Sequence, residues 1–99
     1  MYRVRAVVEE VRGKCPIYKP GDSIVFERFY ISSRESSRVC MHALSAMLTL
    51  LSAFIKGVSA VDLGIGEQPD VGWVQCPDPG PPRTCGGTVV FKLVREPMP

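Results

Sequence analysis

The chain has 99 residues, of which 45% are hydrophobic and 22% are charged, as expected for one globular domain over residues 1–99. The formal net charge is only +2 and the basic residues are scattered singly, so nucleic acid is not an expected partner. The first residues lack the apolar core of a secretory signal, and we therefore expect a cytoplasmic protein.

Two strands are predicted in the first third of the chain. Residues 2–12 alternate, and one face of that strand carries Tyr2, Val4, Ala6 and Val8. Residues 19–22 (KPGD) place proline and glycine as a type II turn prefers. Residues 23–31 then return as the second strand, and a polar loop follows over 32–38.

The apolar run over residues 40–56 predicts one long helix. Its polar side chains fall on one stripe about 80° wide, which comprises His42, Ser45, Thr49, Ser52 and Lys56. The rest of the circumference is apolar, so we expect a largely buried helix covered by the sheet, by a second copy of the chain, or by both. The run is short and diluted for a membrane span, and no membrane association is expected.

The remaining predictions concern the two ends of the helix and the strands in the second half of the chain. Ser36 or Ser37 is a candidate N-cap, and Gly57 suits the C-terminal left-handed position. A glycine-rich loop precedes strands over 71–76 and 88–95, which a proline-rich loop connects. Trp73 is expected in the core. The order ββαββ predicts an α+β fold, a small, mostly antiparallel sheet with one helix packed on it.

The four cysteines are the main functional signal. In a cytosolic chain, cysteines indicate metal binding or redox chemistry before structural disulfides. Cys15 and Cys76 each precede a proline, and Cys85 precedes two glycines. Cys76 and Cys85 are too far apart for a zinc knuckle, which has two intervening residues. Cys40 opens the predicted helix, where the dipole stabilises a thiolate; a buried, inert cysteine is the alternative.

Two polar residues accompany the cysteines. His42 is the only histidine, and on a helix it points away from the side chain of Cys40. It is either a solvent-facing residue or a ligand beside the cysteines. Asp78, between two prolines, is either a turn residue or a residue that fixes a neighbouring ligand. No phosphate-binding loop or catalytic triad is present to decide whether the protein is an enzyme.

Four blocks of sequence point to one family, namely 11–16 (VRGKCP), 40–44 (CMHAL), 74–80 (VQCPDPG) and 86–89 (GGTV). Over nearly its whole length the chain resembles a family of small, uncharacterised prokaryotic proteins known from archaea and from anaerobic or thermophilic bacteria. The family has no assigned activity. The resemblance implies that the important side chains are Cys15, Cys40, Cys76, His42 and Asp78. Cys85 departs from the pattern of the family.

The leading hypothesis is a small metal- or iron–sulfur-binding protein. Its predicted ligands are Cys15, Cys40 and Cys76, with His42 or Cys85 as a fourth, and its predicted cofactor is zinc or an iron–sulfur cluster. The first alternative is a thiol redox or sulfur-handling protein with a reactive Cys40. The second alternative is a structural module that forms a homo-oligomer through its apolar helix.

Overall fold

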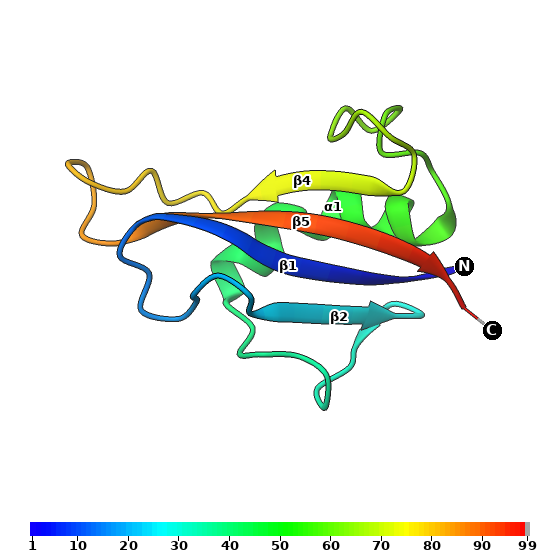
Figure 1. Cartoon of the computed structure of the whole chain (residues 1–99), viewed down its shortest axis with the longest axis horizontal. Helices are drawn as coiled ribbons and strands as arrows, with labels where there is room; N and C mark the ends of the chain where they lie inside the picture. Colours follow the sequence, from blue (N-terminus) through cyan, green and yellow to red (C-terminus); the bar gives the residue numbers. More distant parts are fainter. Residues whose placement is uncertain (99) are drawn as a thin grey trace.

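The computed structural model describes residues 1–98, which form an α+β fold with one helix on a five-stranded antiparallel sheet (Figure 1). The strand order across the sheet is β3-β2-β1-β5-β4. The elements are β1 (Tyr2–Gly13), β2 (Ser23–Glu27), β3 (Tyr30–Ile31), α1 (Met41–Lys56), β4 (Val71–Gln75) and β5 (Gly87–Pro97). The element order is therefore βββαββ, with one strand more than the sequence predicted.

The additional strand arises because the predicted strand over 23–31 is broken in the middle. Arg28 and Phe29 adopt positive φ angles of 45° and 69°, which turn the chain back on itself. The two-residue β3 then pairs with β2, with Ile31 opposite Phe26. Neither arginine nor phenylalanine favours this backbone region, so the residue types gave no signal for the turn.

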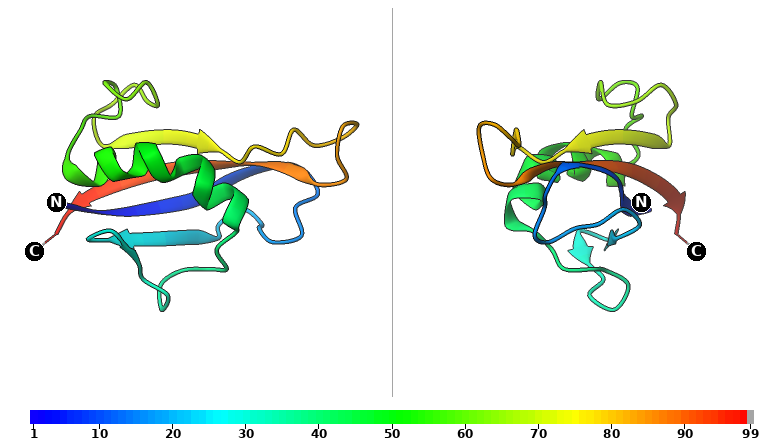
Figure 2. Two further views of the ribbon diagram at one scale, coloured as in Figure 1. Left: turned by 180° about the vertical axis from the view of Figure 1, so that it is seen from behind. Right: turned by 60° about the vertical axis from the view of Figure 1, so that its left-hand side comes forward.

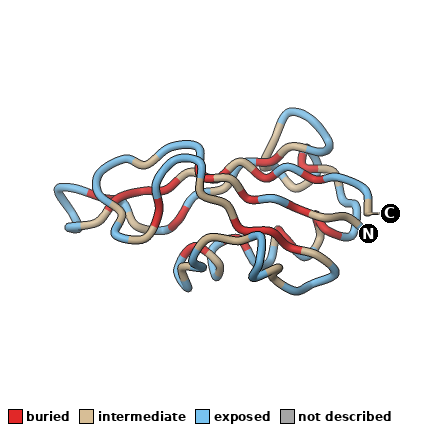
Figure 3. The backbone as a smooth tube through the Cα atoms, turned by 60° about the horizontal axis from the view of Figure 1, so that its bottom comes forward, coloured by how far each residue is buried: buried red, intermediate tan, exposed pale blue. Residues whose placement is uncertain are grey.

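The two long strands at the centre of the sheet provide most of the core. β1 and β5 pair along nearly their whole length, with one irregularity between Val8 and Glu10. Alternate side chains of both strands are buried on the helix side of the sheet, namely Val4, Ala6, Val8, Val89, Phe91 and Leu93. The predicted inward face of the first strand is thus confirmed. Figure 3 shows the buried residues of the chain as red segments of the backbone.

The helix α1 crosses one face of the sheet, as seen from behind in Figure 2. The side chains that it buries are Ala43, Met47, Leu51, Phe54 and Ile55, and the predicted polar stripe is exposed. Met41 is 76% exposed and Leu48 is 52% exposed, however, so the prediction of a largely buried helix is wrong. The reason is that a single sheet covers only one side of the helix.

The helix ends differ in how well the sequence predicted them. Gly57 ends α1 with φ = 117°, as expected. Cys40 is the N-cap and has no side-chain capping hydrogen bond. Ser36 and Ser37 do not cap the helix; their hydroxyl oxygens accept hydrogen bonds from backbone N–H groups of β2. Within residues 1–98, no helix has both the length and the hydropathy that a membrane span requires.

Trp73 lies on the face of the sheet opposite the helix and is 42% exposed, so its predicted place in the core is wrong. Its neighbour across the strand pair is Lys92, whose Nζ lies 5.8 Å from the centroid of the indole ring. No helix among the described residues covers this face, and the long lysine side chain covers part of the indole instead.

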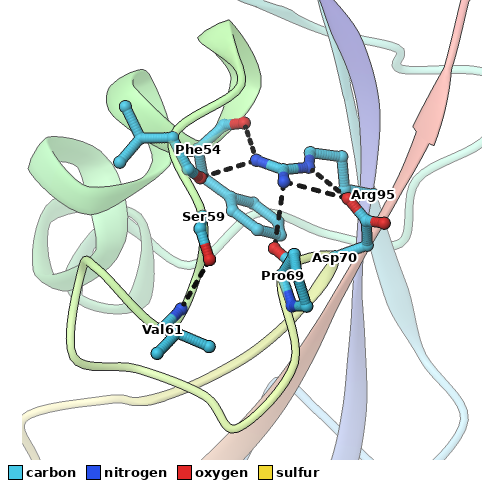
Figure 4. A network of polar contacts seen from close by, with 7 residues as sticks. Phe54, Ser59, Val61, Pro69, Asp70 and Arg95 are labelled. Atoms are coloured by element: carbon cyan, nitrogen blue, oxygen red, sulfur yellow. Dashed lines mark hydrogen bonds and ion pairs between the residues drawn. The ribbon is translucent and has the colours of Figure 1, made fainter.

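Arg95 of β5 ties together the helix end, the following loop and the sheet (Figure 4). Its side chain is only 3% exposed. One guanidinium nitrogen donates to the carbonyl oxygens of Phe54 and Val58, at 2.8 Å and 2.6 Å. The other donates to the carbonyl of Pro69 and the carboxylate of Asp70, both at 2.9 Å. Arg95 thereby adds a charged donor to the Phe54 carbonyl in the last turn of α1 and to two carbonyls of the following loop; the Phe54 carbonyl also accepts from the N–H group of Gly57.

Substituting methionine for Arg95 keeps the apolar stem and removes the donors. We expect the free energy of unfolding to fall by about 2–4 kcal/mol, because three carbonyl oxygens lose a charged donor and the carboxylate of Asp70 loses its ionic partner. Arg5→Met, at an exposed position of β1, is the matched control and should change stability by less than about 0.5 kcal/mol. Urea unfolding measures the free energy of unfolding of the wild type and of both variants. Equal losses in the two would contradict this role of Arg95.

Candidate functional site

Three segments that are distant in sequence meet at one end of the sheet, where β1 and β4 end and α1 begins (Figures 1 and 2). A cavity of about 380 Å³ lies between them. Its polar lining is formed by Cys15, Tyr18, Cys40, His42, Cys76 and Asp78. Apolar side chains that include Ile17, Ala43 and Val89 complete the walls. Four of the five predicted ligands, namely Cys15, Cys40, Cys76 and His42, therefore line one shared space.

Glycines at the end of the central strand pair determine where Cys15 lies. Gly13 has φ = 94°, and a Cβ atom there would lie 2.8 Å from the carbonyl oxygen of Gly86. A Cβ atom on Gly87 would lie 2.8 Å from the backbone nitrogen of Lys14. These positions tolerate only glycine because the two chains pack backbone against backbone. The close approach holds Cys15 beside the start of β5.

Two of the sulfur atoms accept hydrogen bonds from the backbone. The Sγ atom of Cys15 accepts from the N–H groups of Ile17 and Tyr18, at 3.4 Å and 3.3 Å. The Sγ atom of Cys76 accepts from the N–H group of Val89 at 3.2 Å, and its S–H group donates to the carbonyl oxygen of Gly87 at 3.6 Å. The N–H donors favour a sulfur that carries negative charge, as a metal-bound thiolate does, whereas the contact with the Gly87 carbonyl favours the protonated thiol of Cys76.

Cys40 reaches the cavity from the N-terminus of α1. As the N-cap residue it directly precedes the first-turn N–H groups, which have no intrahelical acceptor and carry the positive end of the helix dipole. Its own N–H group donates to the hydroxyl oxygen of Tyr18 at 2.8 Å. The backbone thus places Cys40 in contact with the loop that carries Cys15.

Tyr18 is the site residue that sequence reasoning missed. It is 5% exposed, packs edge-on against Phe91 with ring centroids 5.5 Å apart, and hydrogen-bonds to both Cys15 and Cys40. Burial raises the pKa of Tyr18 above its ordinary value of 10.0, and charge on either of these two cysteines acts in the same direction. The hydroxyl is therefore protonated at neutral pH. The only signal in the sequence was its position three residues after Cys15.

Asp78 organises the proline-rich loop next to Cys76. Its carboxylate accepts hydrogen bonds from the hydroxyl of Thr84 and from the N–H group of Gly80. These two bonds, the first being stronger, lower the pKa of Asp78 below its ordinary value of 3.8, and the nearby charge of His42 adds to the effect. Asp78 is thus a turn residue that also lies near His42. The imidazole of His42 is exposed, at the edge of the cavity.

The remaining predicted ligand lies elsewhere. Cys85 is exposed in the proline-rich loop, outside the set of described residues that line the cavity. All four cysteines are free thiols. As placed, no three His, Cys, Asp or Glu side chains among residues 1–98 are close enough together to hold a metal ion. The cavity therefore brings three thiols into one space without setting them at ligand spacing.

Comparison with protein-family models, with curated proteins and with solved structures found no match to this chain. Membership of the small prokaryotic family that the sequence blocks resemble therefore stays a prediction.

Asp78→Asn tests whether the carboxylate charge stabilises the loop. Because the pKa of Asp78 is lowered in the folded protein, its ionised form contributes stability above about pH 4, and this contribution is lost as the pH falls further. The melting-temperature difference between wild type and variant should therefore be largest at neutral pH and shrink towards pH 3.

Asp62→Asn, in an exposed turn, is the matched control for thermal unfolding over the same range of pH. A difference between wild type and Asp78→Asn that stays constant from neutral pH to pH 3 would show that the charge of Asp78 has no part in stability.

Proposed function

We propose that the cavity is a soft-metal site in which Cys15, Cys40 and Cys76 bind zinc or an iron–sulfur centre. The observation that carries this proposal is that three cysteines from three distant segments line one cavity. Thiolates are the preferred protein ligands of both zinc and iron–sulfur centres.

Charge compensation around the sulfur atoms supports the proposal. Three thiolates around a divalent ion carry one net negative charge, which is costly in a cavity with apolar walls. Cys15 and Cys76 receive backbone N–H donors, and Cys40 adjoins the positive end of the helix dipole. Each of the three sulfurs thus has its own source of compensating positive potential.

Metal binding requires the sulfur atoms to approach one another. Rotation about the Cα–Cβ bond moves a cysteine sulfur by up to about 3 Å with the backbone fixed. Cys40 makes no side-chain capping bond, so its rotation costs no hydrogen bond there.

The test of this proposal is metal content after anaerobic purification. We expect about one metal ion or cluster per chain, reduced by at least about tenfold in the Cys15→Ser, Cys40→Ser and Cys76→Ser variants. Elemental analysis measures the metal content per chain, and circular dichroism shows whether each variant is folded. Cys85→Ser is the matched control and should retain the metal. Metal-free wild-type protein that also takes up no zinc on titration would refute the proposal.

The second candidate function is thiol redox or sulfur-handling chemistry. The observation that favours it is the grouping of three free thiols, one of them at a helix N-terminus, without ligand spacing. In this reading Cys40 is the attacking thiolate, and Cys15 or Cys76 is the resolving thiol. Forming one disulfide would release two protons and two electrons, which an added disulfide accepts as it is reduced to two thiols.

Incubation with oxidised glutathione tests the second candidate. We expect an intramolecular disulfide between Cys40 and either Cys15 or Cys76, which peptide mapping detects and dithiothreitol reverses. In Cys40→Ser this disulfide should be absent, whereas Cys85→Ser should behave as wild type. If glutathione labels only the exposed Cys85 and the cavity thiols stay reduced, the redox hypothesis fails.

A further inference from the structure

Tyr18 connects two of the three cavity cysteines through the opposite ends of one residue. Its backbone N–H group donates to the Sγ atom of Cys15 at 3.3 Å, and its hydroxyl oxygen accepts from the N–H group of Cys40 at 2.8 Å. Burial raises the pKa of Tyr18 most, and charge on Cys40 or Cys15 raises it further, so both sulfur atoms lie near the hydroxyl. Cys15 and Cys40 thus belong to one hydrogen-bonded unit.

The core holds this connecting residue in place. Tyr18 is 5% exposed, and its ring packs edge-on against Phe91 of the central strand β5, with ring centroids 5.5 Å apart. A buried aromatic side chain in a close-packed core keeps one rotamer on the time average. Tyr18 therefore fixes the start of α1 relative to the loop that carries Cys15.

The sulfur of Cys76 is bonded to β5 instead. Its Sγ atom accepts from the N–H group of Val89 at 3.2 Å, and its S–H group donates to the carbonyl of Gly87 at 3.6 Å. Oxidation to a disulfide removes the S–H hydrogen, so the bond to Gly87 would be lost. The contacts of Cys15 need only a sulfur acceptor, and Cys40 makes no side-chain capping bond. Oxidation therefore costs fewer contacts at Cys15 and Cys40 than at Cys76.

We infer that Cys40 and Cys15 form the disulfide of this site and that Tyr18 is the residue that positions them for it. This inference rests on the second candidate function above and goes further by naming the resolving thiol and a positioning residue. The Cys40 thiolate attacks a small disulfide, and one thiolate leaves as the mixed disulfide forms. The Cys15 thiolate then attacks the sulfur of Cys40 and displaces the second thiolate. The two protons that the cysteines lose pass to the two released thiolates.

Peptide mapping of wild-type protein treated with oxidised glutathione identifies the pair. Trypsin cleaves after lysine and arginine except before proline, so each cysteine lies in a peptide of its own, namely residues 15–28, 39–56, 57–83 and 84–92. With free thiols alkylated before digestion, we expect peptides 15–28 and 39–56 to be joined. In Cys15→Ser we expect glutathione to stay on Cys40, with no bond to Cys76.

Tyr18→Phe tests the positioning role, because it removes the hydroxyl and keeps the ring against Phe91. We expect closure of the mixed disulfide to slow by about fivefold, the equivalent of one hydrogen bond. Attack of Cys40 on glutathione disulfide should be nearly unchanged, since that step does not involve Cys15. Mass spectrometry of quenched time points measures both steps. Tyr30→Phe is the matched control, because the hydroxyl of this exposed residue bonds Glu27 away from the cavity.

The outcomes separate this inference from the second candidate function. A bond from Cys76 to either other cavity cysteine would overturn the inference and leave redox chemistry standing. Wild-type protein that forms no intramolecular disulfide would overturn both. If Tyr18→Phe slows both steps equally, or slows closure no more than Tyr30→Phe does, Tyr18 does not position the thiols. The wild-type map decides the pair whether or not Tyr18→Phe folds.

Discussion

The antiparallel pairing of β1 with β5 is the constraint on which the rest of the structure depends. It continues to the very end of β1, where Gly13 lies opposite Gly87. Because both backbones meet there without side chains between them, the loop after β1 is held against the start of β5. The same strand β5 pairs with β4, so the chain leaving β4 at Cys76 lies beside that loop. Pairing alone thus brings two of the three cavity cysteines to one end of the sheet.

The third cysteine depends on how the helix is held across the sheet. Arg95, near the far end of β5, binds one carbonyl group in the last turn of α1 and two in the loop that follows. Tyr18 accepts a hydrogen bond from the backbone of Cys40 at the other end of the helix. The helix is therefore fixed at both ends, and its N-terminus points into the cavity. Cys76 belongs at once to the core cluster and to the cavity lining, so core and site are continuous.

Much of the fold could be predicted from local patterns. The alternation in β1, the apolar run of α1 and the glycine at its C-terminus each act within a few residues, and each prediction was confirmed. The turn at Arg28 and Phe29 could not be predicted, because tertiary packing imposes a backbone that neither residue prefers. The exposure of Met41 and Leu48 was missed because apolar periodicity does not report how many layers cover a helix.

The candidate site, like the fold, could be predicted from the sequence only in part. Residue types identified the four cysteines together with His42 and Asp78. All of these residues line the cavity except Cys85. The role of Tyr18 in the site could not be predicted, because the burial of a residue in an irregular loop depends on tertiary contacts. Ligand spacing could not be judged either, since it depends on rotamers that only three-dimensional neighbours decide.

X-ray absorption at the zinc edge of zinc-loaded protein tests the central claim most directly, because it counts sulfur ligands and measures their distances. We expect three sulfur atoms at about 2.3 Å from the zinc ion in the wild-type protein, and two in Cys76→Ser. A zinc environment of nitrogen and oxygen only, or a sulfur count that Cys76→Ser leaves unchanged, would contradict it.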